Sequence, residues 1–362
     1  MEQGSATDPD PLRPTRESRD ARSRPVVTTA LVVGKFTPFH RGHQRLLEAA
    51  MSTADHVVVL LWSNPDWPLA DSETRASWVR QLYPTLTVLT PIDPPHDSAS
   101  SEDQCNFTRD QLLKHNIMVD LVVSGEDYGA SLAATIGASE LRVDRAELPV
   151  SGTLVRSDIH KNRMWLDPIV YAHFIDRVTI MGAESTGKST LAKALSKHLR
   201  TTWVHEYGRE HYEDRNGLLQ LEDYVEIARV HRRREDEAAL SAFRWTISDT
   251  NAITTMMFSH LYERDSLDEL RRMASECANR YSKFIVCNDD IPFEQDGWRD
   301  TVEWRSRMQG LILGDLASRE IPYVVVSGSL PDRIDRAVAF LDGRVPAGIH
   351  PPRHDGDLGP RP

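Results

Sequence analysis

Cysteine and long apolar stretches are both scarce in this chain. Its 362 residues include 3 cysteines, Cys105, Cys277 and Cys287, whose wide spacing fits neither a zinc site nor a disulfide framework. A reducing cytoplasm is therefore the expected location. No run of about 18 apolar residues occurs, so no membrane span is expected.

Excess positive charge and an apolar leader are missing as well. The formal net charge is −11, which argues against a general binder of nucleic acids or anionic membranes but not against a local nucleotide site. The N-terminal stretch is polar and has no apolar core of a secretory signal. Residues 1–25 and 346–362 are expected to be disordered tails, because such composition cannot bury a core.

Between the tails, strand-like and helix-like segments alternate, which indicates doubly wound α/β architecture with parallel sheets. The length allows two domains, and we predict a Rossmann-like domain over residues 26–174 and a second α/β domain over residues 175–345. The expected strands are 26–33, 56–61, 86–89, 120–124, 177–181, 202–205, 244–248, 283–287 and 323–327. The expected helices include 41–54, 72–83, 102–115, 188–199, 222–241 and 303–319.

The first informative motif follows the first expected strand directly. It reads Gly34-Lys35-Phe36-Thr37-Pro38-Phe39-His40-Arg41-Gly42-His43, and loops at this place bind nucleotides in open α/β sheets. If a helix begins near Arg41, His40 and His43 face one phosphate group at the helix N-terminus, where negative charge is favoured. Imidazoles at this place can stabilise the charge of a phosphate transition state. We predict that both histidines are catalytic.

A later segment supports the same site. Ser151-Gly152-Thr153-Leu154-Val155-Arg156 follows a strand-like stretch and opens a helix. Ser151 and Thr153 are cap-type residues that can also bind phosphate, and Arg156 offers a guanidinium group to the β- and γ-phosphates of ATP. The predicted ATP-binding residues of this site are Gly34, Lys35, Phe36, Thr37, Ser151 and Thr153, with Arg156 as a catalytic residue.

The second motif, Gly182-Ala183-Glu184-Ser185-Thr186-Gly187-Lys188-Ser189, is a complete Walker A pattern between an expected strand and an expected helix. Its backbone N–H groups are expected to surround phosphates, Lys188 to reach the β- and γ-phosphates, and the Ser189 hydroxyl to hold Mg²⁺. The predicted ATP-binding residues of this site are Gly182, Glu184, Ser185, Thr186, Gly187, Ser189 and Thr190.

A kinase of this class also needs an acidic group on a neighbouring strand. Asp249 follows the expected strand 244–248 and is predicted to bind Mg²⁺ or to accept the proton of the substrate hydroxyl, the alternative being a helix N-cap. Arg299 is expected to close on the transferred phosphate. The basic run 231–234 is followed at once by acidic residues, which indicates a solvated helix face.

Several further segments resemble NadR-type bifunctional proteins of the nucleotidylyltransferase superfamily. They are Asn64-Pro65-Asp66-Trp67-Pro68, the helix 74–80, the segment 124–129, Glu206-Tyr207-Gly208-Arg209-Glu210, the segment 249–262 and the segment 289–299. Gly125, Asn251 and Phe293 depart from the family pattern. The resemblance implies that substrate contacts come from Trp67, Arg75, Trp78, Glu206, Arg209 and Asn251.

The resemblance implies two reactions that use ATP and Mg²⁺. The C-terminal half would phosphorylate nicotinamide riboside, and the N-terminal half would adenylylate nicotinamide mononucleotide to NAD and pyrophosphate. Few residues precede the first strand, too few for the helix-turn-helix of some NadR-type proteins, so DNA binding is not expected. A homo-oligomer is compatible with the sequence.

Two alternatives stay open. One keeps the enzyme class but uses another acceptor, namely pantetheine phosphate, FMN or a sugar phosphate. The other is a non-catalytic regulator that senses nucleotides through its P-loop. Catalysis is favoured, because a sensor could dispense with several of the residues that are present, namely His40, His43, Arg156, Lys188, Ser189 and Asp249.

Overall fold

The computed structural model describes residues 28–64, 67–144, 148–293 and 301–348. The predicted tail over residues 1–25 lies outside these ranges. The predicted C-terminal tail requires a correction at its start, because Gly348 forms an antiparallel bridge with Tyr323. Ordered chain therefore continues past residue 345. None of the helices in the described ranges combines the length and the apolar character needed to span a bilayer.

The N-terminal half is built on a five-stranded parallel sheet. Its strands lie in the order β3-β2-β1-β4-β5, and every pairing is parallel. The elements are β1 (Thr29–Gly34), α1 (Arg41–Thr53), β2 (His56–Leu61), α2 (Ser72–Leu82), β3 (Thr87–Leu89), α3 (Ser101–Lys114), β4 (Leu121–Ser124), α4 (Tyr128–Ile136), β5 (Ser139–Arg142), α5 (Gly152–Ser157), a 3₁₀ turn (Arg163–Trp165) and α6 (Pro168–Ala172).

The C-terminal half repeats the architecture with a different strand order, β10-β9-β6-β8-β7, again with parallel pairings only among its named strands. The elements are β6 (Asp176–Met181), α7 (Lys188–Leu199), β7 (Thr202–Val204), α8 (Tyr207–Asp214), α9 (Leu221–Ala239), β8 (Trp245–Asp249), α10 (Ala252–Tyr262), α11 (Asp268–Ser275), α12 (Cys277–Arg280), β9 (Lys283–Cys287), α13 (Val302–Ser318), β10 (Tyr323–Val326) and α14 (Leu330–Leu341).

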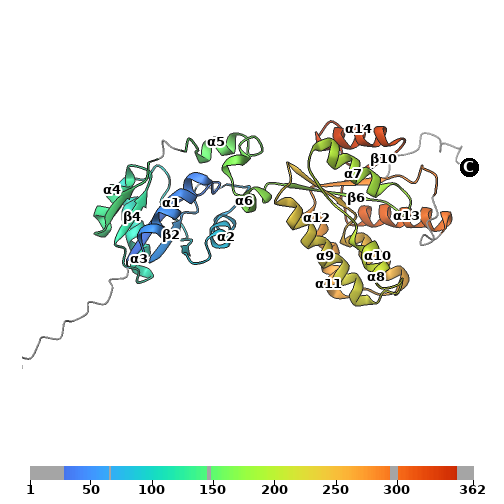
Figure 1. Ribbon diagram of the computed structural model, residues 1–362, viewed down its shortest axis with the longest axis horizontal. Coiled ribbons are helices and arrows are strands. Elements are labelled where there is room, and N and C mark those ends of the chain that lie inside the picture. The colour runs from blue at the N-terminus through green and yellow to red at the C-terminus, as the bar shows by residue number, and fades with distance from the viewer. Residues whose placement is uncertain (1–27, 65–66, 145–147, 294–300, 349–362) are drawn as a thin grey trace, which may run out of the picture.

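Both central strands are buried on two faces, as their continuous apolar sequences predict. In β1, Ala30 and Val32 join one hydrophobic cluster, whereas Leu31 between them joins another. In β6, Met181 and Ile180 are likewise divided between two clusters. Helices accordingly cover both faces of each sheet, as Figure 1 shows. The predicted α/β class with two parallel sheets is confirmed.

The strand order places a functional crevice in each half. From β1 the chain adds strands on one side and then crosses to β4 on the other, and β6 likewise has β8 and β9 on opposite sides. Loops diverge at such a switch point and leave a crevice at the carboxyl ends of the strands. The segment after β1 is the first motif, and the segment after β6 is the Walker A motif.

The two halves meet near α6 and the start of β8 (Figure 1). The guanidinium of Arg163 lies 4.6 Å from the centre of the Phe243 ring, and the His160 ring is also close to Phe243. The backbone N–H of Arg244 donates to the Tyr171 hydroxyl at 3.4 Å. Aromatic and hydrogen-bonded contacts therefore hold the halves together at this junction.

Arg75 ties helix α2 to the ends of the first two strands. Its side chain is 1% exposed, and it donates to the carbonyl oxygens of Lys35, Trp62, Ser63 and Asp71. These carbonyls follow β1 and β2 or begin α2, so a single buried guanidinium group satisfies acceptors from three segments.

We predict that Arg75→Leu lowers the free energy of unfolding by roughly 2–3 kcal/mol, because buried carbonyl oxygens lose their donors. Urea-induced unfolding followed by tryptophan fluorescence measures the change. Arg80→Leu on the same helix is the matched control, since Arg80 pairs with Glu73 at the surface and should change stability little. Equal stability of the two variants would contradict the structural role of Arg75.

Candidate functional site

The two histidines of the first motif cap helix α1 reciprocally. His40 is the N-cap, and its Nδ1 accepts from the backbone N–H of Gly42 at 3.1 Å. The Nδ1 of His43 accepts from the backbone N–H of His40 at 3.2 Å. The rings stack with centroids 3.7 Å apart. Because each Nδ1 is an acceptor, each neutral ring carries its proton on Nε2, so the paired rings present N–H donors.

The second segment is joined to the first through Thr37 and Arg156. The Arg156 guanidinium donates to the Thr37 carbonyl at 2.5 Å and to its hydroxyl at 3.2 Å. Gly152 makes the approach possible, because a Cβ at this position would lie 2.7 Å from the Thr37 carbonyl oxygen. Ser151 caps α5 by accepting from Leu154 N–H. The structure therefore brings Arg156 to the loop that carries Thr37, His40 and His43. Thr37 and Arg156 are 119 residues apart in the sequence.

Other residues predicted for the first site have different positions. Phe36 is 1% exposed and packs against His43 and Phe39, so it supports the histidines. The Lys35 ammonium pairs with Asp97 at 2.8 Å. Thr153 lies beside Arg156, whose guanidinium donates to its hydroxyl at 3.2 Å.

The aromatic and arginine contacts inferred for the acceptor need correction at two positions. Trp78 is 3% exposed, and its ring packs on His173 and Phe174. The Arg75 guanidinium donates its hydrogen bonds to backbone carbonyl oxygens, as described above. Both face inward because α2 packs its apolar side on the core. Trp67 is partly buried and contacts Phe174.

The Walker A segment forms the expected turn between β6 and α7. Gly182 has φ +140 and its Cβ position lies 2.8 Å from the Cys287 carbonyl, so a side chain is excluded there. Gln309 holds the loop from α13, accepting from Ala183 N–H and donating to the Cys287 carbonyl, each at 2.9 Å. Lys188 Nζ lies 2.9 Å from the Ala183 carbonyl oxygen.

A cavity of about 710 Å³, which we call the kinase-type cavity, opens in front of the P-loop. Its walls come from the P-loop, the start of α8, one face of α9, α10 and the segment after β9. The lining residues predicted from the sequence are Glu184, Ser185, Thr186, Gly187, Lys188, Ser189, Thr190, Glu206 and Arg209.

Polar atoms without partners lie in the wall of this cavity and next to it. Asp249 ends β8 and is fully buried, yet neither of its carboxylate oxygens has a hydrogen-bond partner within the described residues. The hydroxyls of Thr250 and Thr254, which line the cavity, are buried and unpartnered there as well. Thr250 has φ +68, a strained value for a β-branched residue. Such groups are costly unless a ligand or water satisfies them.

Asn251, not Asp249, caps the following helix. Its Oδ1 accepts from Ile253 N–H at 2.9 Å, and its Nδ2 donates to the Thr179 hydroxyl at 3.2 Å. Asn251 is 1% exposed and supports the cavity from beneath. The inferred substrate contact of Asn251 is therefore replaced by a capping role, because its amide is already used within the protein.

Charged groups of both signs lie near the Glu206 carboxyl. Burial raises the pKa of the Glu206 carboxyl above its ordinary value, and the nearby Asp249 carboxylate adds to the increase, whereas Lys188 and Arg209 act against it. Glu206, Asp249 and Lys188 are thus electrostatic neighbours, and Glu206 and Lys188 are partly buried. Such arrangements are typical of functional sites rather than of surface ion pairs.

Two arginines hold the chain after β9, and one of them also contacts the P-loop. Arg333, 3% exposed, donates to the Thr186 carbonyl at 2.6 Å and to the Asp290 carboxylate. Arg305 donates to the Ile291 carbonyl at 2.9 Å. These contacts hold Asp290 and Ile291, which lie in the described start of the segment 289–299. Arg299, the residue predicted to close on the phosphate, lies outside the described residues.

A magnesium ion is compatible with these donors. Mg²⁺ keeps several waters and takes few protein ligands beside phosphate oxygens. The exposed Ser189 hydroxyl at the start of α7 and the unpartnered Asp249 carboxylate are oxygen ligands of that kind. Over the described ranges no group of three His, Cys, Asp or Glu residues gathers as a metal site, so phosphate oxygens would have to complete the coordination.

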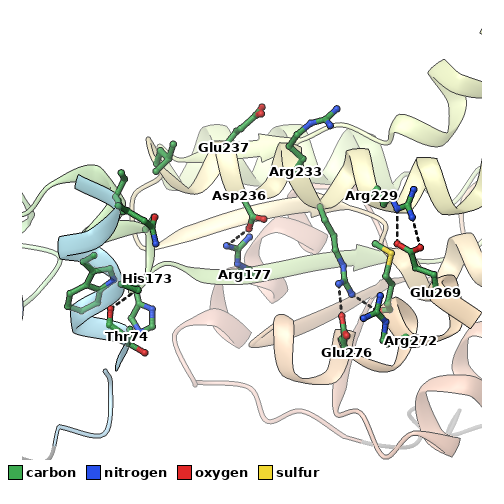
Figure 2. A pocket seen from close by; sticks show the side chains of 18 residues that line it. Thr74, His173, Arg177, Arg229, Arg233, Asp236, Glu237, Glu269, Arg272 and Glu276 are labelled. Carbon is green, nitrogen blue, oxygen red and sulfur yellow. Dashed lines mark hydrogen bonds and ion pairs between the residues drawn. The ribbon is translucent and has the colours of Figure 1, made fainter. Parts of the chain in front are cut away.

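Another hollow, of about 880 Å³, lies between the halves, and Figure 2 shows its lining. His173 lies on the wall from the N-terminal half. On the opposite wall Arg177 pairs with Asp236 at 2.8 Å, and Arg229 makes a two-pronged contact with Glu269. These arginines already have carboxylate partners, so the hollow does not resemble a phosphate site.

Comparison with known proteins connects both halves to the motifs that they contain. Residues 31–157 match a cytidylyltransferase-like family model, and residues 177–333 match an AAA domain model.

Two curated relatives are similar across both halves. The trifunctional NAD biosynthesis/regulator protein NadR of Escherichia coli (strain K12) is 26% identical over 328 residues, covering 83% of this chain and 78% of the relative. The protein of the same name from Salmonella typhimurium is 26% identical over 325 residues, covering 82% and 78%. This chain is similar to NadR across both halves.

Solved structures of NadR share the fold. A crystal structure of NadR protein in complex with NR gives a TM-score of 0.67 at 20% identity, covering 88% of this chain and 96% of that chain. The complex with NAD and AMP-PNP gives 0.64 at 20% identity with the same coverage. The structural likeness therefore covers the fold of both halves.

One residue group was assigned incorrectly by the sequence pattern. The run 231–234 is predicted to be a solvated helix face, and Arg233 is indeed exposed. His231, however, is 5% exposed and lines the kinase-type cavity, and Glu235 one turn later is fully buried. The sequence pattern did not indicate this burial, because the helix face formed by Tyr224, Ile227 and His231 mixes polar and apolar residues.

We predict that Glu206→Gln raises the unfolding temperature of the ligand-free protein near pH 7. Because its pKa in the folded protein lies above the ordinary value, Glu206 stabilises the fold at pH values below that ordinary pKa. This stabilisation is lost as the pH rises through the folded-state pKa. The gain should therefore shrink as pH falls toward 4.5, the ordinary value. Calorimetry at several pH values measures it.

Glu213→Gln is the control, because Glu213 is exposed at the rim of the same cavity. Its unfolding temperature should equal that of the native chain at each pH. A Glu206→Gln protein no more stable than the native chain at pH 7 would rule out a destabilising buried charge at Glu206.

Proposed function

We propose that this chain phosphorylates nicotinamide riboside with ATP and then adenylylates the product with a second ATP, giving NAD and pyrophosphate. One observation carries the proposal: a chain similar to NadR contains two separate phosphate-type sites, each after the central strand of its own sheet. The relatives are named as NAD biosynthesis proteins, and solved NadR structures hold NR, NAD and AMP-PNP.

The phosphorylation step takes place in the cavity of the C-terminal half. The 5′-hydroxyl oxygen of the riboside attacks the γ-phosphorus of ATP, the bond to the β-phosphate oxygen breaks, and ADP leaves. Asp249 accepts the hydroxyl proton, a role supported by its buried, unpartnered carboxylate. Lys188 and the P-loop N–H groups neutralise charge on the phosphates. Mg²⁺ held by Ser189 and Asp249 would supply further charge neutralisation.

The adenylylation step takes place at the loop after β1. A phosphate oxygen of the mononucleotide attacks the α-phosphorus of ATP, and pyrophosphate leaves. The Nε2–H groups of His40 and His43 donate to phosphate oxygens, and Arg156, already seated on Thr37, stabilises the leaving pyrophosphate. Positioning and electrostatic stabilisation suffice for this displacement, and no covalent enzyme intermediate is required.

We propose that Trp67 stacks on the pyridine ring in the N-terminal half. Glu206 and Arg209 are proposed to contact the riboside in the C-terminal half.

A reducing cytoplasm is the proposed location, supported by three cysteines that are all buried and free. Burial raises the pKa of the Cys277 thiol to about 11 and that of Cys287 to about 12, so neither thiol is ionised near neutral pH.

The overall reaction is tested by incubating the full chain with ATP, Mg²⁺ and nicotinamide riboside. Formation of the mononucleotide followed by NAD supports the proposal. Parallel reactions with pantetheine phosphate, FMN or a sugar phosphate test the other acceptors. Adenylylation of one of these, without NAD formation, would replace the proposed function by that activity.

We predict that Lys188→Ala reduces riboside phosphorylation by roughly 10³-fold, because the variant loses the cation at the transferred phosphate. Adenylylation of supplied mononucleotide should stay near the native rate. Product formation in the two separate assays measures both activities. Lys193→Ala, an exposed lysine on the same helix, should leave both unchanged. Loss of adenylylation in the Lys188 variant would contradict the assignment of two independent sites.

We predict the reverse for His43→Asn, with adenylylation lowered roughly 10²-fold and the mononucleotide accumulating from riboside. Asparagine keeps an acceptor for the His40 N–H but lacks the Nε2–H donor, so the helix cap survives while the catalytic donor is lost. His43→Ala, which loses both, serves as comparison and should also be less stable by about 1 kcal/mol. NAD synthesis at the native rate by His43→Asn would refute the catalytic assignment.

A further inference from the structure

Helix α9 presents three residues to the kinase-type cavity, spaced so that they share one face. Tyr224, Ile227 and His231 all line the cavity, and the helix runs from Leu221 to Ala239. Glu235 lies one turn beyond His231 on the same side. The mechanism given above uses neither His231 nor Glu235.

Glu235 is a buried anion with a complete set of partners. Its side chain is 0% exposed, one carboxylate oxygen accepts from the Tyr281 hydroxyl, and the other accepts from Arg280 Nε at 2.8 Å. Burial acts to raise the pKa of Glu235, but His231 and Arg280 together with Tyr281 outweigh it and hold that pKa below its ordinary value. The group is therefore a carboxylate near neutral pH.

This carboxylate orients the imidazole of His231. Glu235 Oε1 lies 3.5 Å from His231 Nδ1, and a ring nitrogen that faces a carboxylate carries hydrogen. The other ring nitrogen, Nε2, is buried and has no hydrogen-bond partner among the described residues. In the neutral ring Nε2 is then an acceptor, held beside the cavity that His231 lines.

The surroundings indicate what this acceptor can receive. Glu206 lines the same cavity, and His231 lies near enough to influence the Glu206 carboxyl electrostatically, so the two groups are neighbours. A ribose carries two adjacent hydroxyls, each a hydrogen-bond donor. A carboxylate and a neutral imidazole nitrogen are two acceptors that match such a pair, and a neutral ring does not repel a cationic pyridinium base.

We propose that His231, oriented by Glu235, accepts a hydrogen bond from a ribose hydroxyl of the nucleoside and so selects ribosides over deoxyribosides. The inference rests on the proposed riboside kinase activity and adds a residue that determines its specificity. His231 is the substrate-contacting member, and Glu235 is a positioning residue that acts through it.

Two substitutions of His231 separate its two ring nitrogens. His231→Asn places an amide near Glu235 but loses the group that faces the cavity. His231→Gln reaches toward the cavity with an acceptor oxygen but loses the contact with Glu235. Arg233→Gln, at an exposed position of the same helix, is the matched control. All are made in the full chain, and an unchanged KM for ATP in riboside phosphorylation reports on proper folding of the C-terminal half.

The measurement is kcat/KM for nicotinamide riboside and for its 2′-deoxy and 3′-deoxy analogues, with the KM for ATP measured beside it. In the native chain and in Arg233→Gln the riboside should be preferred. His231→Asn should raise the KM for the riboside about tenfold and reduce the preference over one deoxy analogue by a similar factor. The KM for ATP should not change, and His231→Gln should retain more of the preference.

The possible failures are distinguishable. If the native chain does not phosphorylate the riboside, the proposed function fails and the inference falls with it. If riboside phosphorylation is intact but His231→Asn discriminates between hydroxyls as well as the native chain, the inference alone is overturned. Equal loss of preference in His231→Asn and His231→Gln, with the KM for ATP unchanged, also overturns it, because an acceptor at the Nε2 position would then not matter.

Discussion

The N–H groups of the first helical turn have no partners within their helix, and both halves of this protein place them at the end of a central parallel strand. In a parallel sheet with strands added on both sides, the loop after that strand opens into a crevice. The first motif and the Walker A motif both occupy such a position. Phosphate binding in each half thus depends on strand order as much as on the motif residues.

Around these helix starts, the two halves stabilise phosphate charge differently. In the N-terminal half, stacked histidines cap α1 with their Nδ1 atoms, which leaves their N–H donors on Nε2. In the C-terminal half, Glu206 and Lys188 line one cavity, and the buried Asp249 carboxylate lies close to both. Polar groups that lack partners, such as the Asp249 carboxylate, are typical of a site shaped for a ligand.

The buried carboxylate of Glu235 extends this logic behind the cavity. It lies at the centre of contacts from α9 and from the segment 280–281, so it joins two parts of the fold while orienting His231. A charge buried without such partners would be strongly destabilising. Packing and site geometry therefore depend on the same residue, which makes α9 both a structural helix and a wall of the site.

The sequence by itself determined nine of the described strands, several of the longer helices and both phosphate motifs, because these depend on local periodicity and on contiguous residues. Helix α7 and strands β2 and β9 begin and end at the predicted residues, and Lys188 and Ser189 follow from one uninterrupted pattern. Only the tertiary structure decided the roles of Arg75, Trp78, Asn251 and His231. Their partners come from other segments, as with Glu235 and Tyr281, which are 46 residues apart, and burial depends on which faces pack together.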